Sequence, residues 1–273
     1  MNFSLKNKWV LITGASSGFG AAAAKAFGRE GAKLLLGARR VERLKKVAAE
    51  AKKAGAGEAH FHSLDVGKTA SVGAFVAWAK ELMEKRKAKG GKAETAGLHV
   101  LINNAGGALG LDTLAAGKDE DWEGMIQSNF LGLLRMTRAA LPLMPHEAGA
   151  SILNVGSIAG RAPYEGGSVY GGAKAAELHV TRALRLELNG TGIRVSSIDP
   201  GLAKTDFSLV RFKGDAVRAE KVYEGTNPLT AEDMADIMVW VASRPPHVCI
   251  DELLVKPVDQ AAMHKIYRRK NQT

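Results

Sequence analysis

The sequence predicts an α/β fold in which helices cover both faces of a parallel sheet. Short apolar segments of strand length alternate along the chain with longer segments whose apolar residues recur with a helical period. The runs WVLI at 9–12 and KLLL at 33–36 are almost continuously apolar, which is typical of strands buried on both sides. The 273 residues, of which 46% are hydrophobic, suffice for one large domain of this class.

Seven segments are expected to form strands. They are residues 8–13, 33–38, 60–64, 98–103, 151–156, 193–199 and 251–257. Residues 20–31 and 41–55 show helical periodicity between the first three of these. A further helix is expected to begin after Thr230, with a capping box to Asp233, and to end before Pro245 and Pro246.

One domain is expected over residues 1–273, without internal repeats, and the hydrophilic residues 85–97 are expected to form a surface loop inserted before the fourth strand. No apolar run approaches the roughly 20 residues of a membrane span, and the N-terminal residues lack a signal-peptide layout. Cys249 is the single cysteine, so an intramolecular disulfide and a multi-cysteine metal site are excluded. We therefore expect a cytoplasmic protein with no membrane contact.

The formal net charge of +10 raises the question of an acidic partner. Lysine and arginine are spread along the chain, with local excesses at 84–94 and 264–273, and neither excess has the interleaved aromatic residues of a single-strand binding surface. No nucleic-acid partner is predicted from them. His60 and His62 share a strand face but have no third ligand at a suitable spacing, so no metal site is predicted either.

The first chemical motif is TGASSGFG, residues 13–20, directly between the first strand and the first helix. Glycines there allow positive φ and let backbone N–H groups approach an anion, and the helix N-terminus adds partial positive charge. A dinucleotide pyrophosphate suits this arrangement, although the glycine spacing differs from Gly-x-Gly-x-x-Gly and an ordinary glycine-rich turn is the alternative. The predicted contacts are Gly14, Ser16, Ser17, Gly18, Phe19 and Gly20.

The end of the second strand indicates which dinucleotide is bound. An acidic residue there accepts from the ribose 2'-hydroxyl of NAD, whereas arginine suits the 2'-phosphate of NADP. This chain has Ala38 at that place, followed by Arg39 and Arg40. NADP(H) is therefore favoured over NAD. The alternative for Arg40 is that it simply begins an exposed helix.

Further polar motifs follow later strands, at the sheet edge where ligands bind in open α/β folds. Asp65 and Val66 follow the third strand, NNAG at 103–106 ends the fourth, and SVYGGAKAA places Tyr170 and Lys174 one helical turn apart. With TGASSGFG, these motifs resemble those of the short-chain dehydrogenase/reductase family, in the family's order and over nearly the whole chain. The resemblance implies a Rossmann-type, doubly wound, seven-stranded parallel sheet and an oxidoreductase that uses NADP(H).

The resemblance also implies roles for single residues. Tyr170 matches the family's general acid and base. A free phenol has a pKa near 10, and the nearby ammonium of Lys174 favours its ionised form. Ser157 matches the serine that hydrogen-bonds the reacting oxygen, and Asn129 the asparagine that holds a water in the proton relay. Ordinary turn and helix hydrogen bonds are the alternatives for Ser157 and Asn129. The further cofactor contacts implied are Asp65, Val66, Asn104, Ala105, Gly106, Tyr170, Lys174, Pro200, Gly201 and Thr205.

The C-terminal half resembles the NADP-dependent branch of the family that oxidises serine, allo-threonine and other 3-hydroxy acids. That resemblance implies a substrate lid at about 202–228 and a homo-tetramer. We hypothesise that Arg211 pairs with a substrate carboxylate and that Tyr164 lines the pocket. A lid-surface charge or a contact between subunits is the alternative for Arg211. The alternative functions are a reductase of bulkier ketones or acyl thioesters and, more remotely, a non-catalytic NADP sensor or nucleic-acid binder.

Overall fold

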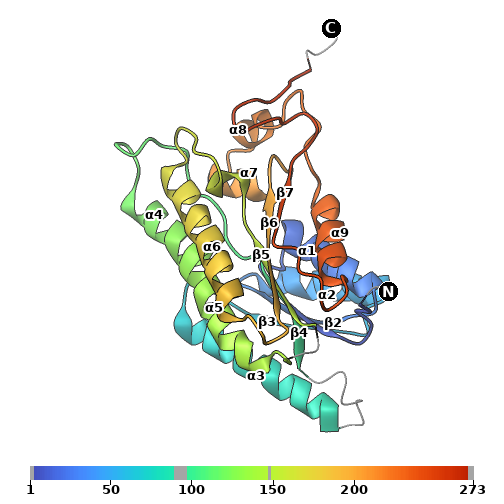
Figure 1. Ribbon diagram of the computed structural model, residues 1–273. Coiled ribbons are helices and arrows are strands. Elements are labelled where there is room, and N and C mark those ends of the chain that lie inside the picture. Colours follow the sequence, from blue (N-terminus) through green and yellow to red (C-terminus); the bar gives the residue numbers. More distant parts are fainter. Residues whose placement is uncertain (1–2, 89–96, 147–148, 270–273) are drawn as a thin grey trace.

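The computed structural model describes residues 3–88, 97–146 and 149–269 (Figure 1). Within them, seven strands form one sheet of parallel pairs in the order β3-β2-β1-β4-β5-β6-β7. The strands are β1 (Trp9–Thr13), β2 (Lys33–Ala38), β3 (Glu58–Ser63), β4 (Leu98–Asn103), β5 (Ser151–Val155), β6 (Arg194–Pro200) and β7 (Glu252–Val255). The fold class expected from the sequence is confirmed.

Helices cover both faces of this sheet (Figure 1). One layer is α1 (Gly18–Arg29), α2 (Val41–Ala54) and α9 (Ala231–Ala242), and the other is α3 (Thr69–Ala88), α5 (Gly132–Ala140) and α6 (Ser168–Glu187). Successive residues of β1 alternate between the two cores, so that Ile12 is buried with the first layer and Leu11 with the second. This is why β1 has four consecutive apolar residues, Trp9–Ile12.

The strand order creates the position of the site. From β1 the chain winds outward to β2 and β3, and then returns to the other side of β1 with β4. The connections after β1 and β4 therefore leave in opposite directions, which opens a crevice at the carboxyl ends of these two strands. The loops after β5 and β6 begin at the same edge of the sheet, because all the strand pairs are parallel.

Shorter elements complete the described fold. Helix α4 (Asp119–Met125) continues through a π-helical turn (Ile126–Leu131) into α5, and a short 3-10 turn (Ile158–Gly160) follows β5. The segment expected to be a lid contains α7 (Phe207–Arg211) and α8 (Ala216–Lys221). Figure 1 shows α8 at the top of the molecule, away from the two helix layers.

The boundaries of α9 and α3 illustrate two different outcomes. Thr230 and Asp233 form the expected capping box, and α9 ends before the two prolines as predicted. Helix α3 instead runs to Ala88, whereas a loop was expected from residue 85. Lys85 pairs with Glu81 one turn earlier at 2.5 Å, and such pairs favour continued helix. The rest of the expected loop, 89–96, lies outside the described residues.

The described ranges contain neither a candidate membrane span nor a candidate metal site. None of the described helices combines the length and the apolar character that crossing a bilayer requires. No group of three or more His, Cys, Asp or Glu side chains in these ranges could hold a metal ion. His60 lies 2.8 Å from a carboxylate oxygen of Glu58, and the ring of His62 lies 5.2 Å from that of Trp78. Both histidines therefore have local structural partners.

Candidate active site

A cleft of about 610 Å³ opens at the carboxyl edge of the sheet. It contains nearly all the residues that the sequence singled out, drawn from six strand ends, α1, α6 and the lid. Those that line it are Gly14, Ser16, Ser17, Gly18, Phe19, Arg39, Arg40, Asp65, Val66, Asn104, Ala105, Gly106, Ser157, Tyr164, Tyr170, Lys174, Pro200, Gly201, Thr205 and Arg211. Gly20 and Asn129 are not among the lining residues and lie behind the surface of the cleft.

The glycine-rich turn allows a ligand to approach its backbone closely. Gly14 and Gly18 have φ of +66° and +51°, a conformation that other residues rarely adopt. A Cβ atom at Gly20 would lie 2.6 Å from the carbonyl oxygen of Gly14, so Gly20 is required by packing rather than by ligand contact. The N-cap residue Ser17 makes no side-chain capping bond to α1. The turn therefore fits a pyrophosphate at the helix N-terminus.

Threonine and asparagine hold this turn against the loop after β4. The hydroxyl of Thr13 accepts hydrogen bonds from the backbone N–H groups of Asn104 and Ala105, both at 2.9 Å. The side-chain amide of Asn104 donates to the carbonyl of Thr13 at 2.9 Å. The two loops that border the crevice are thus tied together. Thr13 was not singled out from the sequence, because a threonine at a strand end has no distinguishing pattern.

Positive charge gathers at the end of the cleft next to β2. Arg40 donates to the hydroxyls of Ser17 at 2.6 Å and Ser16 at 3.1 Å, so it faces the glycine-rich turn. Partial burial, followed by repulsion from Arg43 and Arg39, lowers the pKa of Arg40. Such mutual repulsion would be relieved by a bound anion, which fits a ribose phosphate here. The sequence analysis did not single out Arg43. Its position four residues after Arg39 could have indicated that it adds positive charge next to the cleft.

Tyr170, Lys174 and Ser157 meet at the centre of the cleft. Tyr170 and Lys174 lie one turn apart on α6 and are both buried, with 9% and 7% of their surfaces exposed. The ammonium of Lys174 donates to the carbonyl of Val155 at 2.8 Å. The hydroxyl of Ser157 accepts from the N–H of Ala159 at 3.1 Å and caps the short turn after β5. A hydroxyl, a phenol and an ammonium therefore share one wall of the cleft.

The turn that carries Ser157 needs the glycines around it. A Cβ atom at Gly156 would lie 1.9 Å from a carboxylate oxygen of Asp199, and one at Gly160 would lie 2.7 Å from the backbone of Lys174. A side chain at position 156 would displace Asp199 on β6, and one at position 160 would push the turn away from α6. The packing of Asp199 thus disfavours a second hydroxyl-bearing side chain beside Ser157, at position 156.

Lys174 has a second partner that the sequence analysis missed. Glu177, one turn further along α6 and 2% exposed, accepts a hydrogen bond from the ammonium at 2.8 Å. Burial raises the pKa of Glu177 to about 7, against the opposing effect of Lys174. Burial alone would lower the pKa of Lys174, but Glu177, together with Tyr170 and Asp199, acts in the opposite direction and the pKa is raised. The spacing of three residues was a signal that could have found this pair.

The side chain of Asn129 is hydrogen-bonded to the backbone around it. Its side-chain nitrogen donates to the carbonyls of Gly107 and Met125, each at 2.8 Å, and its oxygen accepts from the N–H of Gly107 at 3.1 Å. The π-helical turn thus anchors the loop after β4. These bonds correspond to the structural alternative given for Asn129, and its function in a proton relay stays a prediction.

The substrate end of the cleft is an aromatic cage around Arg211. The guanidinium carbon lies 4.9 Å from the ring centre of Phe207, 5.3 Å from that of Tyr170 and 5.8 Å from that of Tyr164. One terminal nitrogen of Arg211 donates to the hydroxyl of Tyr164 at 2.7 Å. Its Nε is buried without a hydrogen-bond partner among the described residues. A guanidinium has five N–H donors, so this cage leaves donors for an anion.

The C-terminal segment also lines the cleft. Met263 and Ile266 are among its lining residues, and the side chain of Gln260 accepts from the N–H of Leu202 in the lid at 2.7 Å. The sequence analysis did not find these residues, because a tail that folds back over a site has no periodic signature. Met263 and Ile266 add apolar surface to this end of the cleft.

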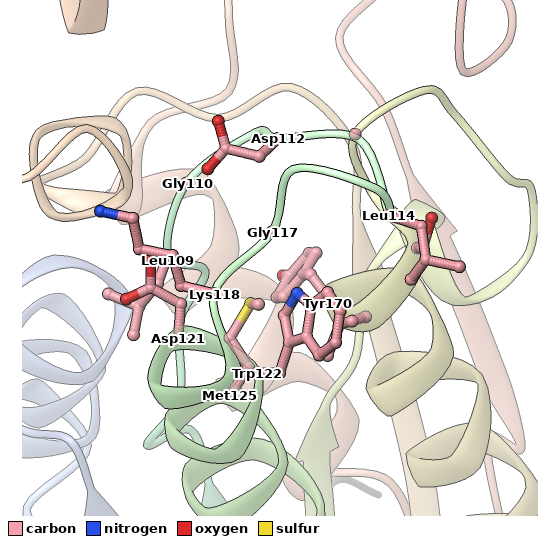
Figure 2. A pocket seen from close by; sticks show the side chains of 13 residues that line it. Leu109, Gly110, Asp112, Leu114, Gly117, Lys118, Asp121, Trp122, Met125 and Tyr170 are labelled. Atoms are coloured by element: carbon pink, nitrogen blue, oxygen red, sulfur yellow. The ribbon is translucent and has the colours of Figure 1, made fainter.

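A second, much smaller hollow lies on the α4 side of Tyr170. Figure 2 shows Trp122 and Met125 beside Tyr170, and Asp112 and Asp121 are also among the lining residues. Its volume is about 20 Å³, which is enough for about one water molecule and too small for a substrate. The larger cleft is therefore the candidate active site.

Comparison with known proteins identifies the family to which this cleft belongs. Residues 8–214 match the sequence model described as short chain dehydrogenase. The chain belongs to the short-chain dehydrogenase family. The family expected from the motifs is thereby confirmed, together with the expectation of an oxidoreductase.

Several relatives of this short-chain dehydrogenase resemble it over nearly their whole length. Serine 3-dehydrogenase of Agrobacterium fabrum is 39% identical over 262 residues, 95% of this chain and 98% of the relative. The NADP-dependent 3-hydroxy acid dehydrogenase YdfG of Escherichia coli K12 is 40% identical over 92% of this chain and 96% of the relative. Sulfoacetaldehyde reductase of Chromohalobacter salexigens is 42% identical over 92% and 94%. The expected resemblance to the 3-hydroxy acid branch is confirmed.

A solved structure agrees with these relatives. The closed form of a serine dehydrogenase complexed with NADP+ aligns with a TM-score of 0.81 and 39% identity, covering 96% of this chain and 100% of the other. The similarity therefore extends beyond the family model, which ends at residue 214, into the C-terminal segment.

Proposed function

We propose that this short-chain dehydrogenase interconverts an alcohol and a carbonyl in a small molecule that carries an acidic group, with NADP(H) as the hydride carrier. The observation that carries the choice of substrate is Arg211, whose guanidinium lies against the ring of Tyr170 with a buried N–H left unpaired. Serine, 3-hydroxy acids and sulfoacetaldehyde, named for the relatives, all have an anionic group near the carbon that reacts. A guanidinium suits carboxylate and sulfonate alike.

The residues of the cleft fit NADP(H) along its length. The glycine-rich turn would receive the pyrophosphate, Arg39 and Arg40 the 2'-phosphate, and Pro200, Gly201 and Thr205 the nicotinamide end. Asp65, Val66, Asn104, Ala105 and Gly106 would line the adenosine and ribose portions between these ends. When bound, the nicotinamide supplies hydride to a carbonyl carbon or accepts it from an alcohol carbon.

The proton transfer falls to Tyr170. In reduction its hydroxyl gives a proton to the carbonyl oxygen as that oxygen gains negative charge, and in oxidation the phenolate takes the proton back. Ser157 would donate a hydrogen bond to the same oxygen and hold it in place. The ammonium of Lys174, fixed by Val155, favours the phenolate that remains after reduction. Asn129 keeps the neighbouring loop in position, and its function in the relay stays part of this proposal.

We also propose that residues 202–228 act as a lid on one catalytic domain formed by the whole chain. A Cβ atom at Gly18 would lie 3.5 Å from that of Thr205, so the start of this segment reaches the glycine-rich turn. Asp206 pairs with Arg43 at 3.2 Å, next to the predicted phosphate site. The segment thus contacts the glycine-rich turn and the side chain of Arg43, and closing it would exclude water from the hydride transfer.

A homo-tetramer in the cytoplasm completes the proposal. Leu186, Leu254 and Val258 expose 79%, 44% and 103% of their surfaces, and β7 is an edge strand of the sheet. A second copy would cover this apolar edge. Light scattering coupled to gel filtration measures the assembly, and cell fractionation tests the location. A monomer at micromolar concentration would contradict the tetramer.

One substrate panel tests the function as a whole. 3-Hydroxy acids, their methyl esters, the corresponding carbonyl compounds and acyl thioesters are followed by the absorbance of the reduced nicotinamide, with NADP and with NAD. We expect turnover of the acids with NADP and a large loss on esterification. Equal rates for acids and esters would favour the reductase of bulkier ketones. Cofactor binding without turnover of any compound would favour a sensor, and salt-dependent DNA retention a nucleic-acid binder.

A further inference from the structure

Glu177 is a buried carboxylate beside the central lysine, and the proposed reaction does not use it. It is 2% exposed, and its Oε2 lies 2.8 Å from the ammonium of Lys174. Lys174 also donates to the carbonyl of Val155 on β5 at 2.8 Å. An ammonium has three N–H donors, so these two partners leave one donor for the cleft. The position of the ammonium is therefore set by Glu177 and Val155 together.

The other charged group packed against this pair has its own counter-ion. Asp199 on β6 is 1% exposed and acts electrostatically on both Lys174 and Glu177. Its carboxylate accepts from Nε of Arg161 at 2.7 Å and from the hydroxyl of Ser197 at 2.6 Å. The charge of Asp199 is thus matched by Arg161. Glu177 is the carboxylate whose charge bears directly on the ammonium.

The state of Glu177 decides how much positive charge faces the phenol. With Glu177 ionised, the pair has no net charge; with Glu177 protonated, the full charge of Lys174 acts on Tyr170 one turn away. A full positive charge favours the phenolate, and a neutral pair leaves the proton on the phenol. The ionised carboxylate therefore supports reduction, in which Tyr170 must hold a proton to give.

We propose that Glu177 is a positioning residue that sets, through Lys174, the pH range in which Tyr170 exchanges its proton. The inference rests on the proposed function, because it assigns Tyr170 the proton transfer. Glu177 touches neither substrate nor cofactor in this account. Burial favours protonation of Glu177 near neutral pH. The net charge of the Glu177–Lys174 pair therefore changes within the pH range of the cell.

The test is Glu177→Gln, which keeps the size and a hydrogen-bond acceptor for Lys174 but removes the charge. We expect the midpoints of the pH profiles of kcat/KM, in oxidation and in reduction, to move to lower pH by about one unit. Glu177→Asp should keep the wild-type midpoints even if its maximal rate falls. Glu187→Gln removes an exposed charge from the same helix and should leave the midpoints unchanged. A merely structural role would alter rate or thermal stability and leave the midpoints of Glu177→Gln in place, which would overturn the proposal.

A second measurement needs neither cofactor nor turnover. The near-ultraviolet absorbance of tyrosinate is titrated in the free protein, and the contribution of Tyr170 is obtained by subtracting Tyr170→Phe in each background. Tyr170 should ionise at lower pH in Glu177→Gln than in wild type. If the proposed reaction fails on every substrate, this titration still decides the inference. An unchanged ionisation of Tyr170 would reject it, and Glu177→Met, which also removes the charge, serves the same comparison if the glutamine variant does not fold.

Discussion

The guanidinium of Arg211 lies over the ring of Tyr170, with 5.3 Å between its central carbon and the ring centre. The two side chains come from α7 in the lid and from α6, and they meet across the cleft. The hydroxyl of Tyr164 accepts a hydrogen bond from a terminal nitrogen of Arg211 at 2.7 Å. A cation is therefore fixed next to the proposed proton donor, where an acidic group attached to the reacting carbon would lie.

Arg211→Ala should raise the KM for acidic substrates about 10- to 100-fold, because a hydrogen bond to a charged group contributes roughly 1.5–3 kcal/mol. The methyl esters should be affected much less. Arg211→Lys should recover part of the affinity, since an ammonium lacks the planar fork. Arg218 stacks on Phe212 in the same segment but is exposed and outside the cleft, so Arg218→Ala is the matched control. An unchanged KM in steady-state kinetics would reject the clamp.

Tyr170→Phe removes one hydroxyl and keeps the ring that packs against Phe207 and Arg211. Turnover should fall by roughly 10²- to 10⁴-fold in both directions, the range for loss of a general acid or base. NADP affinity measured by fluorescence titration should stay within a few-fold, and the melting temperature should be unchanged. Tyr267, 66% exposed, provides the control Tyr267→Phe. Full activity of Tyr170→Phe would remove the basis of the mechanism.

The sheet was predictable because its central strands satisfy one strong condition. Residues 33–38 and 98–103 coincide with β2 and β4, and each contains a run of three consecutive apolar residues, Leu34–Leu36 and Val100–Ile102, which burial on both faces favours. The motifs at the carboxyl ends of the strands then lie together as a consequence of parallel topology. Tyr170 and Lys174 could be paired from sequence because helical geometry alone brings them together.

Residues that enter the site through tertiary contacts were not predictable in this way. Met263 and Ile266 reach the cleft only because the C-terminal segment folds back over it. Arg43 pairs with Asp206 at 3.2 Å, although the two residues are separated by more than half the chain in sequence. Glu177 differs, because its spacing from Lys174 was visible. Its burial, which raises its pKa, was not.

Arg40→Ala should weaken NADP binding by about 10- to 100-fold and leave NAD binding nearly unchanged. Arg40 faces the serines of the glycine-rich turn, and the phosphate that distinguishes the two dinucleotides would add a charge-assisted bond to it. Isothermal titration with each dinucleotide measures the ratio. Arg29, exposed at the end of α1, supplies the control Arg29→Ala. Equal losses for NADP and NAD would show that Arg40 serves the fold rather than the phosphate.

Glu252→Gln should destabilise the protein near neutral pH and matter progressively less in acid. Side-chain bonds from Arg182, together with Arg161 and against a smaller effect of burial, lower the pKa of Glu252 to about 2. A carboxylate with a depressed pKa contributes stability above its ordinary value of 4.5, and that contribution is lost as the pH falls towards 2. Thermal unfolding at pH 7, 5 and 3 should show the difference in melting temperature shrinking. A constant difference at all three values would contradict this linkage.

Arg194 offers a test of the fold that is separate from the chemistry. It lies on β6, is 5% exposed, and donates to the carbonyls of Ala242 at 2.9 Å, Arg244 at 3.0 Å and Gly149 at 3.0 Å. The last carbonyls of a helix have no partner within the helix, so Arg194 supplies donors to the end of α9. It also joins that end to the loop before β5.

Arg194→Met keeps much of the side-chain volume and leaves these buried carbonyls without donors. Each unsatisfied group costs about 1–3 kcal/mol, so we expect a loss of roughly 3 kcal/mol or more and a fall in melting temperature of about 10 °C. Below that temperature the kinetic constants and NADP affinity should match wild type, because Arg194 does not line the cleft. Arg138→Met, on the exposed surface of α5, is the control. A melting temperature within a degree or two of wild type would mean that water or neighbouring N–H groups replace Arg194 as the donor at the end of α9.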